Sequence, residues 1–405
     1  MRILIISELP IPSRRKSYRA DPLSKYFPKM GHEITVVCPK SPFQSQKYLR
    51  DYENVTFSYI APNERTTHNP LKRFFAFVAM AKKIRKELKE GKFDVIRPIS
   101  FLPAYAAICA NNKQKVPLVV NLSDFYSDLY KQFELPFTSA AVNILRNMEK
   151  TIARQSDVLI VDSPTQREYW KQWGLEENRC VVLPNGLNLE LFSPKINVEK
   201  AKSHCGIDEK KVVFYHGDIS HMDGIDVLVA AAPAIIKGAD DVNIMVVGSG
   251  SRYANKLKSI VKAKGLEHFF IFTGWVPHTN IPQYIAAANV CVAPFRLTLT
   301  SNSNLMNKVI EYLAMRKPIV ATGSSGLKEM LGDIANYIEP DDPKMLADVT
   351  LHVLNEHSFT ARVPRMLKIA EKLDWKKIVQ HEEKIINAML NHKGQDFRML
   401  DYRLT

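Results

Sequence analysis

The chain of 405 residues lacks any run of about 18 apolar residues, and this excludes a helical segment long enough to span a bilayer. Low-complexity segments and short internal repeats are also absent. The first residues, 1–7, are too soon interrupted by polar residues for a secretory signal, so we predict a first strand there. Cysteines are few and have no paired spacing, which argues against disulfides or a zinc cluster: Cys38, Cys109, Cys180, Cys205 and Cys291. We therefore expect a globular cytoplasmic protein with reduced thiols.

Acidic residues are outnumbered, because 56 lysines and arginines stand against 42 aspartates and glutamates, a formal net charge of +14. Such an excess suits nucleic acid, anionic membrane or phosphorylated substrates. Nucleic acid is the poorest of these, since no nucleic-acid module signature occurs and aromatic residues do not alternate with the basic ones as a strand-binding platform requires. We expect a membrane surface and an anionic substrate as partners, and no nucleic acid.

Apolar strand-like runs alternate with helix-length segments along the chain, a pattern that predicts an α/β protein with parallel sheets. A length of 405 residues favours two domains. The first series of predicted strands covers residues 3–6, 33–37, 55–60, 94–97, 118–121 and 158–161. A second series covers residues 212–215, 243–247, 269–272, 290–293 and 318–321. We predict domains at 1–190 and 191–373, with a final segment at 374–405 that contains a helix.

The most informative segment is 302–323. Polar residues that can open a helix come first, an apolar-faced helix with one acid, Glu311, follows, and Lys317-Pro318 ends it before a buried-type strand. The free backbone N–H groups of such a helix start suit a phosphate. A carboxylate about two turns further on suits a ribose diol. The alternative is that Glu311 is a solvated helix acid and the preceding loop a plain cap.

Residues 307–321 closely match the pattern N-K-[LVI]-[FI]-E-Y-[ML]-A-x-x-[KR]-P-[IV]-[VI]-A. Together with residues 156–163, 182–192 and 272–290, which follow in the same order, this segment resembles the retaining glycosyltransferases of family 4. The resemblance implies the GT-B fold, in which two doubly wound, Rossmann-like domains face a central cleft. The first domain would bind the acceptor and the second a nucleotide sugar. The last helix would cross back to the first domain, and no metal or other cofactor would be required.

The resemblance also implies roles for single residues. Glu311 corresponds to the ribose-binding acid, residues 303–307 to the diphosphate-binding turn, and residues 272–276 to the strand end beside the base. The donor-binding residues expected on this basis are Gly217, Gly274, Trp275, Val276, Ser303, Asn304, Leu305, Met306, Asn307 and Glu311.

Two departures concern the phosphate. Family members usually carry G-R-x-x-x-x-K-G after the first strand of the second domain, but Asp218 and Asp223 replace both cations here. Because an acid repels a diphosphate, we expect Lys308 to supply the positive charge as a catalytic residue. Ser303 stands where the first of two family acids is usual.

The first domain also departs from the family. Glu8 to Arg15 replaces a glycine pair, and Arg14 and Arg15 could meet a phosphate. Ser123 replaces a histidine that often precedes an aspartate, which leaves Asp124 as the second expected catalytic residue, a base or an anchor for the acceptor hydroxyl. The alternative for Asp124 is a turn residue at a strand end.

A basic amphipathic helix is predicted at residues 69–91. Its apolar positions recur at three- and four-residue intervals: Leu71, Phe74, Phe75, Val78, Ala81 and Leu88. Lysines and arginines fill much of the rest, so the helix either packs on the sheet with solvated lysines or rests on anionic lipid. The pairs at 240–241 and 341–342 are predicted surface turns rather than metal ligands.

These observations predict a retaining hexosyltransferase that uses a nucleotide sugar and a glycan or lipid-linked acceptor, in the cytoplasm or on the inner face of the membrane. Two alternatives stay open: a nucleotide-sugar epimerase of similar fold, and a non-catalytic binding subunit. Sugar isomerisation without acceptor distinguishes the first, and donor hydrolysis or transfer by the purified chain excludes the second.

Overall fold

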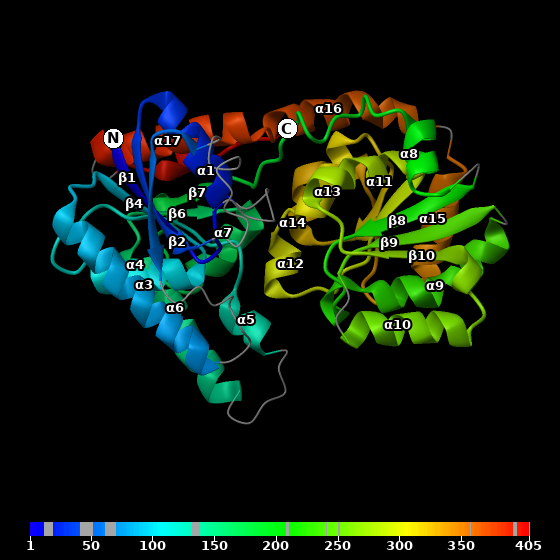
Figure 1. Cartoon of the computed structure of the whole chain (residues 1–405), viewed down its shortest axis with the longest axis horizontal. Coiled ribbons are helices and arrows are strands. Elements are labelled where there is room, and N and C mark those ends of the chain that lie inside the picture. The colour runs from blue at the N-terminus through cyan, green and yellow to red at the C-terminus, as the bar shows by residue number, and fades with distance from the viewer. Residues whose placement is uncertain are drawn as a thin grey trace. The chain divides into compact units, whose positions relative to one another are not determined.

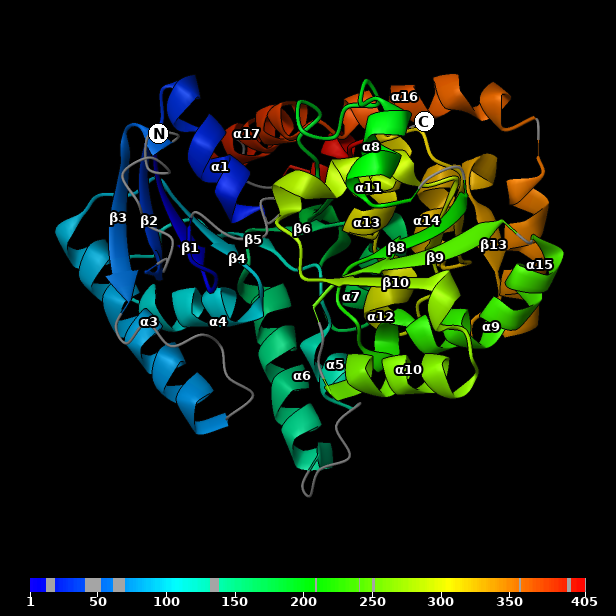
Figure 2. The same ribbon diagram turned by 45° about the vertical axis from the view of Figure 1, so that its right-hand side comes forward.

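The computed structural model describes residues 1–11, 19–40, 52–60, 70–131, 138–207, 210–239, 241–249, 252–356, 358–391 and 395–404. The chain divides into two compact units. Unit 1 comprises Met1–Asn185 with Trp375–Arg403, and unit 2 comprises Gly186–Asp374 with the last two residues. Each unit is a parallel sheet with helices on both faces (Figures 1 and 2).

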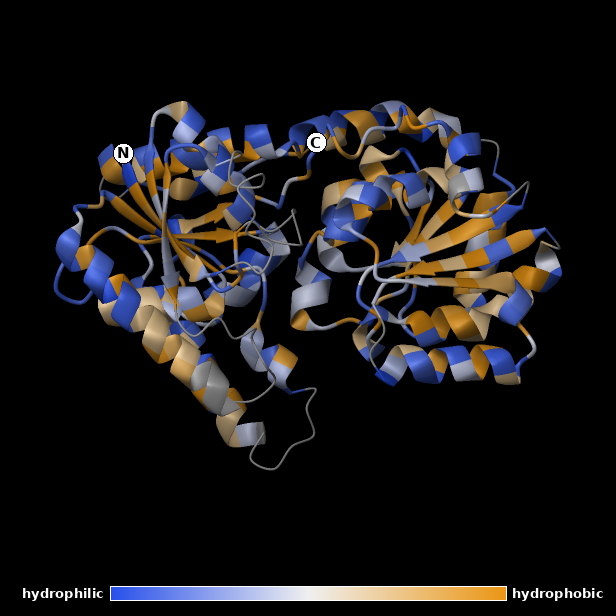
Figure 3. Cartoon of the chain, in the orientation of Figure 1, coloured by the Kyte–Doolittle hydropathy of each residue, from blue (hydrophilic) through white to orange (hydrophobic). Residues whose placement is uncertain are grey.

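The sheet of unit 1 has seven strands in the order β3-β2-β1-β4-β5-β6-β7. Their bounds are Arg2–Ser7, Glu33–Pro39, Val55–Ile60, Val95–Ile99, Val119–Asn121, Val158–Val161 and Cys180–Val182 for β1 to β7. The central strands β1 and β4 are buried on both faces, which is why they are largely apolar apart from Arg97 of β4 (Figure 3).

Helices cover both faces of this sheet. On one face lie α3 (Pro70–Glu90), α4 (Phe101–Ala110) and α6 (Thr138–Gln155), and on the other α1 (Ala20–Tyr26) and α17 (Trp375–Asn391) (Figure 2). The short helices α5 (Tyr126–Tyr130) and α7 (Pro164–Lys171) complete the unit. Ile378, Ile385 and Ile386 of α17 belong to the same apolar core as Ile3 and Ile5 of β1. The end of the chain is therefore an integral part of unit 1.

The sheet of unit 2 has six strands in the order β10-β9-β8-β11-β12-β13. Their bounds are Lys211–His216, Val242–Val247, Phe270–Gly274, Val290–Ala293, Ile319–Thr322 and Asn336–Ile338 for β8 to β13. The helices are α8 (Val198–His204), α9 (Ile225–Gly238), α10 (Arg252–Ala263), α11 (Ile281–Ala287), α12 (Leu299–Ser303), α13 (Asn307–Ala314), α14 (Ser325–Leu331), α15 (Pro343–Leu354) and α16 (Val363–Lys372). Two parallel Rossmann-like sheets confirm the predicted fold class.

Two strands escaped prediction. β7 and β13 each have three residues and stand at an edge of their sheet. Segments this short hold too few residues for a hydrophobic period to appear, so only the pairing with β6 and β12 defines them.

The predicted basic helix is α3, which begins at Pro70, and Asn69 lies outside the described residues. Its buried stripe is Met80, Ile84 and Leu88, whereas Phe75 is 64% exposed. Placing Phe75 in the same apolar stripe as Leu88 was therefore wrong, because at about 100° per residue Phe75 points to the side of the helix opposite Met80, Ile84 and Leu88. Within the described ranges, no helix has both the length and the apolar character needed to cross a membrane.

Candidate active site

Glu311 occupies the centre of a polar cluster in unit 2. Helix α13 carries it, and its side chain is only 3% exposed. Nε2 of His278, in the turn after β10, lies 2.8 Å from Oε1 of Glu311. Nε2 of His216, the last residue of β8, lies 3.0 Å from Oε2. The carboxylate therefore sits by the carboxyl ends of two sheet strands, where open α/β sheets bind ligands. Its burial rules out a solvated helix acid.

The two histidines keep this carboxylate ionised. Burial alone would raise the pKa of Glu311, but hydrogen bonds and charge interactions with His216 and His278 lower that pKa to about 2. Burial also lowers the pKa of His216. Each oxygen of Glu311 thus faces one histidine nitrogen, and a carboxylate has about four lone-pair sites on its two oxygens. The carboxylate can therefore accept further hydrogen bonds from a ligand, and Nδ1 of His278 is buried without a hydrogen bond.

Most side chains of the turn before α13 are buried. Ser303, Asn304 and Leu305 are 0%, 8% and 3% exposed. The hydroxyl of Ser303 donates to the carbonyl of Leu299 at 2.7 Å, inside its own helix. Met306 is the N-cap of α13 and supplies no side-chain cap. The N–H groups of Val309 and Ile310 donate to the carbonyl of Met306 at 2.9 and 3.2 Å, whereas those of Asn307 and Lys308 receive no side-chain acceptor from this cap.

Lys308 extends from the first turn of α13 toward the end of β8. Its Nζ donates to the hydroxyl of Tyr215 at 2.7 Å and to Oδ1 of Asp223 at 2.9 Å. We expected Asp223 to repel a diphosphate, but here it is the counterion of Lys308, the catalytic cation expected to bind that group. Gly217 lies alongside with a φ of +140°, and a Cβ at this position would stand 3.0 Å from Nζ of Lys308.

The predicted base-side residues form the loop that follows β10. Gly274 ends the strand, Trp275 is 54% exposed, and Val276 leads to the turn that carries His278. Sequence reasoning identified this loop but missed His216 and His278 themselves. A signal was available, because His216 immediately precedes Gly217 and His278 lies two residues after Val276.

In unit 1, Asp124 lines a pocket of about 70 Å³ together with Glu8, Ser100, Asn121, Ser123 and Tyr126. Oε1 of Glu8 accepts hydrogen bonds from the hydroxyls of Ser100 at 2.7 Å and Tyr126 at 3.1 Å. Burial, together with the charges of Asp162 and Glu8, raises the pKa of Asp124 to about 6. This carboxyl can therefore change its protonation state near neutral pH.

Ser100 is the strained residue of this pocket. Its φ of +83° and ψ of 170° lie in a region that residues with a side chain rarely adopt. The backbone is held there by a hydrogen bond from its N–H to the carbonyl of Asn121 at 3.1 Å, and the side chain by Glu8. Strain of this kind costs about 1–3 kcal/mol and concentrates at functional sites.

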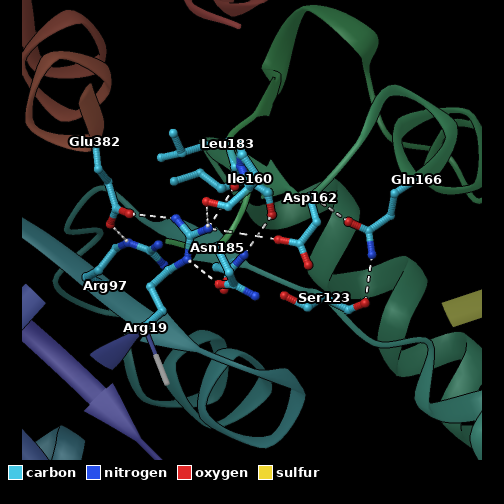
Figure 4. A network of polar contacts seen from close by, with 11 residues as sticks. Arg19, Arg97, Ser123, Ile160, Asp162, Gln166, Leu183, Asn185 and Glu382 are labelled. Carbon is cyan, nitrogen blue, oxygen red and sulfur yellow. Dashed lines mark hydrogen bonds and ion pairs between the residues drawn. The ribbon is translucent and has the colours of Figure 1, made fainter. Parts of the chain in front are cut away.

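A buried ionic network runs from the neighbourhood of this pocket to α17 (Figure 4). Gln166 donates to the carbonyl of Ser123 at 2.7 Å and accepts from the N–H of Asp162 at 2.6 Å. Nη2 of Arg19 lies 3.9 Å from Asp162, and Nη1 donates to Glu382 of α17 at 2.9 Å.

Arg19 also anchors the chain where unit 1 ends, since its Nη2 donates to the carbonyls of Leu183 and Pro184 at 2.7 and 2.9 Å. Arg97 is the second cation on Glu382. Burial would raise the pKa of Glu382, but these two arginines hold it below its ordinary value. Arg14 and Arg15, the other cations proposed for a phosphate, lie outside the described residues.

Among the residues that the structure describes, no group of three or more histidines, cysteines, aspartates or glutamates could hold a metal ion.

Comparison with known proteins extends over both units. Residues 19–191 match the model of "Glycosyltransferase Family 4", and residues 210–356 match that of "Glycosyl transferases group 1". The lipopolysaccharide core biosynthesis mannosyltransferase LpsB of Rhizobium meliloti is 27% identical over 237 residues, which are 56% of this chain and 64% of the relative.

A phosphatidyl-myo-inositol mannosyltransferase of Mycobacterium leprae is 24% identical over 356 residues, 85% of each chain. The crystal structure of Anabaena HepE in complex with UDP and glucose superposes with a TM-score of 0.75 at 18% identity, covering 96% of this chain and 100% of HepE. Both halves of the chain thus match models of one enzyme class in the expected order. The chain belongs to the group 1, family 4 glycosyltransferases and has their GT-B fold.

Proposed function

We propose that unit 2 binds the nucleotide part of a nucleotide sugar, with the ribose hydroxyls donating to Glu311. The observation that carries this proposal is the carboxylate of Glu311, which is 3% exposed at the carboxyl ends of the strands and ionised, with a pKa of about 2. Each of its oxygens faces one histidine nitrogen and has further lone pairs, so the carboxylate can accept from two adjacent hydroxyls. His216 and His278 hold it in place from either side.

We propose that the diphosphate binds the backbone amides at the start of α13 and the ammonium group of Lys308. Residues 303–306 of the preceding turn, most of them buried, would line the site. Gly274, Trp275 and Val276 are proposed to contact the base. Departure of the nucleoside diphosphate concentrates negative charge on its terminal phosphate, and preorganised amides and an ammonium group stabilise that charge. An acceptor hydroxyl that attacks from the same face gives the retaining outcome.

Asp124 is proposed to hold the acceptor hydroxyl in unit 1. The support is its place in a polar pocket and a pKa of about 6, which lets the carboxylate accept a proton as the new bond forms. Glu8, Ser100 and Tyr126 would orient the same acceptor through the hydrogen bonds that already join them.

The acceptor class is proposed to be a glycan or a lipid-linked sugar, and the transferred group a hexose. Support comes from the names of the similar proteins, which include a mannosyltransferase of lipopolysaccharide core biosynthesis and a phosphatidyl-myo-inositol mannosyltransferase. UDP-glucose, bound by HepE in another solved structure, is the first donor to test. Docking of the cytoplasmic chain on an anionic inner membrane surface is proposed through α3, where Phe75 is exposed and Lys82, Arg85 and Lys86 face solvent.

The test is a screen of nucleotide sugars with the purified chain. Binding is measured by titration calorimetry, and donor hydrolysis or transfer to a lipid-linked acceptor by release of nucleoside diphosphate. A nucleotide sugar that binds and is hydrolysed or transferred supports the proposal. Isomerisation of the sugar without acceptor would favour the epimerase alternative, and binding without any turnover would favour a non-catalytic subunit.

A further inference from the structure

Contacts with Tyr215 and Asp223 fix the position of the Lys308 ammonium group. Its Nζ lies 2.7 Å from the hydroxyl of Tyr215 and 2.9 Å from Oδ1 of Asp223, and 4.4 Å from the centroid of the Tyr215 ring. Tyr215 is fully buried at the end of β8. Its hydroxyl also lies 2.7 Å from the carbonyl oxygen of Asp218 and 3.0 Å from Oδ1 of Asp223. A flexible lysine stem is thus held at its ammonium end by two side chains.

Asp223 is itself fixed by its second oxygen. Oδ2 accepts from the hydroxyl of Ser220 at 2.6 Å and from the N–H of Ser220 at 3.3 Å, a capping box that closes the turn at residues 221–223. Gly224 follows with a φ of +68°, and a Cβ there would stand 1.8 Å from the carbonyl oxygen of Pro294. The two oxygens of Asp223 therefore have separate partners: Oδ2 closes the turn, and Oδ1 faces Lys308 and Tyr215.

This arrangement exchanges the usual places of charge. The resemblance implies cations on the turn after the first strand of the domain, but this chain has an acid on that turn and the cation on α13. A lysine paired with an aspartate attracts a diphosphate less strongly than a lysine alone, because the pair has no net charge. Asp223 therefore adds little to the affinity of the site for the bound donor. Instead, it fixes the position of the Lys308 ammonium group beside Gly217, and a fixed position matters most where charge develops during the reaction.

We propose that Asp223 and Tyr215 are positioning residues for glycosyl transfer, which hold the Lys308 ammonium where the departing diphosphate acquires its charge. This inference rests on the proposed function, because it assumes that a nucleoside diphosphate is the leaving group. It assigns a role in turnover to an acid whose sequence position suggests only repulsion of the donor.

The central variant is Asp223→Asn, in which the amide oxygen can keep the turn closed on Ser220 while the amide nitrogen faces Lys308. We expect kcat to fall at least tenfold while the donor KM changes less than threefold. Lys308→Met should lower kcat at least as much. Tyr215→Phe removes the second contact to Nζ and should lower kcat by a smaller factor, about threefold. Unchanged kcat in Asp223→Asn, or a raised KM at constant kcat, would overturn the proposal.

A second readout reports on Lys308 without any turnover. Acetylation of Lys308 by acetic anhydride, measured by mass spectrometry, should be at least fivefold faster in Asp223→Asn than in the wild type. An unchanged rate would refute the hold of Asp223 on Lys308. If the wild type transfers no sugar from any donor while Asp223→Asn still exposes Lys308, the proposed function fails and the contact stands.

Two variants serve as controls. Asp241→Asn removes an exposed aspartate 3.9 Å from Lys211 at the other end of β8, and should leave kcat and KM unchanged. Ser220→Ala removes the turn-closing partner of Oδ2, so its melting temperature shows what loss of the cap alone does. A kcat loss in Asp223→Asn no greater than that in Ser220→Ala would mean that Asp223 acts only through the turn, and would overturn the proposal.

Discussion

Replacing Glu311 by glutamine tests the donor site most directly. The change keeps the shape of the side chain and removes its charge, which the structure places next to His216 and His278. The carboxylate is 3% exposed, and its pKa of about 2 means that it is ionised throughout the neutral range. A ribose hydroxyl that donates to it therefore meets a full negative charge in a site with little competing water.

The magnitude follows from that charge. A hydrogen bond to a charged group contributes about 1.5–3 kcal/mol, so the Kd for a nucleoside diphosphate should rise roughly tenfold to a hundredfold in Glu311→Gln. The free energy of unfolding should fall by about 1–3 kcal/mol, because Nε2 of His278 loses a charged acceptor inside the fold. A surface acid would show neither effect.

Titration calorimetry with two ligands separates ribose recognition from general damage. The wild type should bind a nucleoside diphosphate at least tenfold more tightly than its 2′,3′-dideoxy analogue, whereas Glu311→Gln should bind the two with similar Kd. Glu371→Gln, which removes an exposed acid of α16 in the same unit, should behave as the wild type. If the wild type does not distinguish the two ligands, or if Glu311→Gln still does, the carboxylate does not bind the diol.

Three further outcomes are expected. For Lys308→Met, turnover should fall at least tenfold, about 1.4 kcal/mol in barrier, because the stem volume is kept and only the ammonium is lost; activity near the wild type would point to another cation. With Asp124 as the base, kcat/KM should fall as the pH drops below about 6, and Asp124→Asn should lower kcat roughly a hundredfold or more. The folded-state pKa of Asp124 lies above its ordinary value, so the ionised form destabilises the fold, and Asp124→Asn should unfold at a higher temperature than the wild type at pH 7. A kcat/KM that does not change with pH, together with normal turnover in Asp124→Asn, would exclude Asp124 as the base. Co-sedimentation with anionic liposomes should exceed that with neutral liposomes at 0.1 M salt, where the screening length is roughly 10 Å, and should weaken as salt is added; equal partitioning would leave the lysines of α3 solvated.

Acid unfolding provides a separate check on Glu311. Its folded-state pKa of about 2 lies below the ordinary value of 4.5, so the ionised carboxylate stabilises the fold above pH 4.5 and this contribution is lost as the pH falls toward 2. The shift corresponds to on the order of 3 kcal/mol. Urea titrations between pH 5 and 2.5 should show a steeper loss of stability in the wild type than in Glu311→Gln, and parallel curves would contradict the depressed pKa.

Much of the fold was predictable because buried parallel strands have nearly continuous apolar sequences. The predicted strand at 158–161 coincides with β6, and the predicted helix at 69–91 occupies nearly the same residues as α3. Three- and four-residue spacing did not reveal which face of α3 the core would cover, since Phe75 and Leu88 lie on opposite sides of the helix and differ in burial. Packing partners, and not the helix itself, make that choice.

The candidate sites were predictable at the level of loops and less so at the level of side chains. Glu311 and Lys308 stand out in a motif that is local in sequence. Their partners Asp223 and His278 come from other strand ends, 85 and 33 positions away, and only the sheet order brings them together. From its sequence position alone, Asp223 is an acid that replaces a cation usual in the family. Only the structure shows that it pairs with Lys308.

The division of unit 1 between the two ends of the chain affects how the protein is made. A ribosome releases α17 only after Gly186–Asp374 of unit 2 has emerged, yet Glu382 of that helix is the buried acid shared by Arg19 and Arg97. Removing one partner of a buried ion pair destabilises a fold by about 3–5 kcal/mol, because the other charge is left buried and uncompensated. Domains usually complete their folding from the N-terminus onward during synthesis. Here we expect the reverse order, in which unit 2 folds while the nascent first unit waits for its last helix.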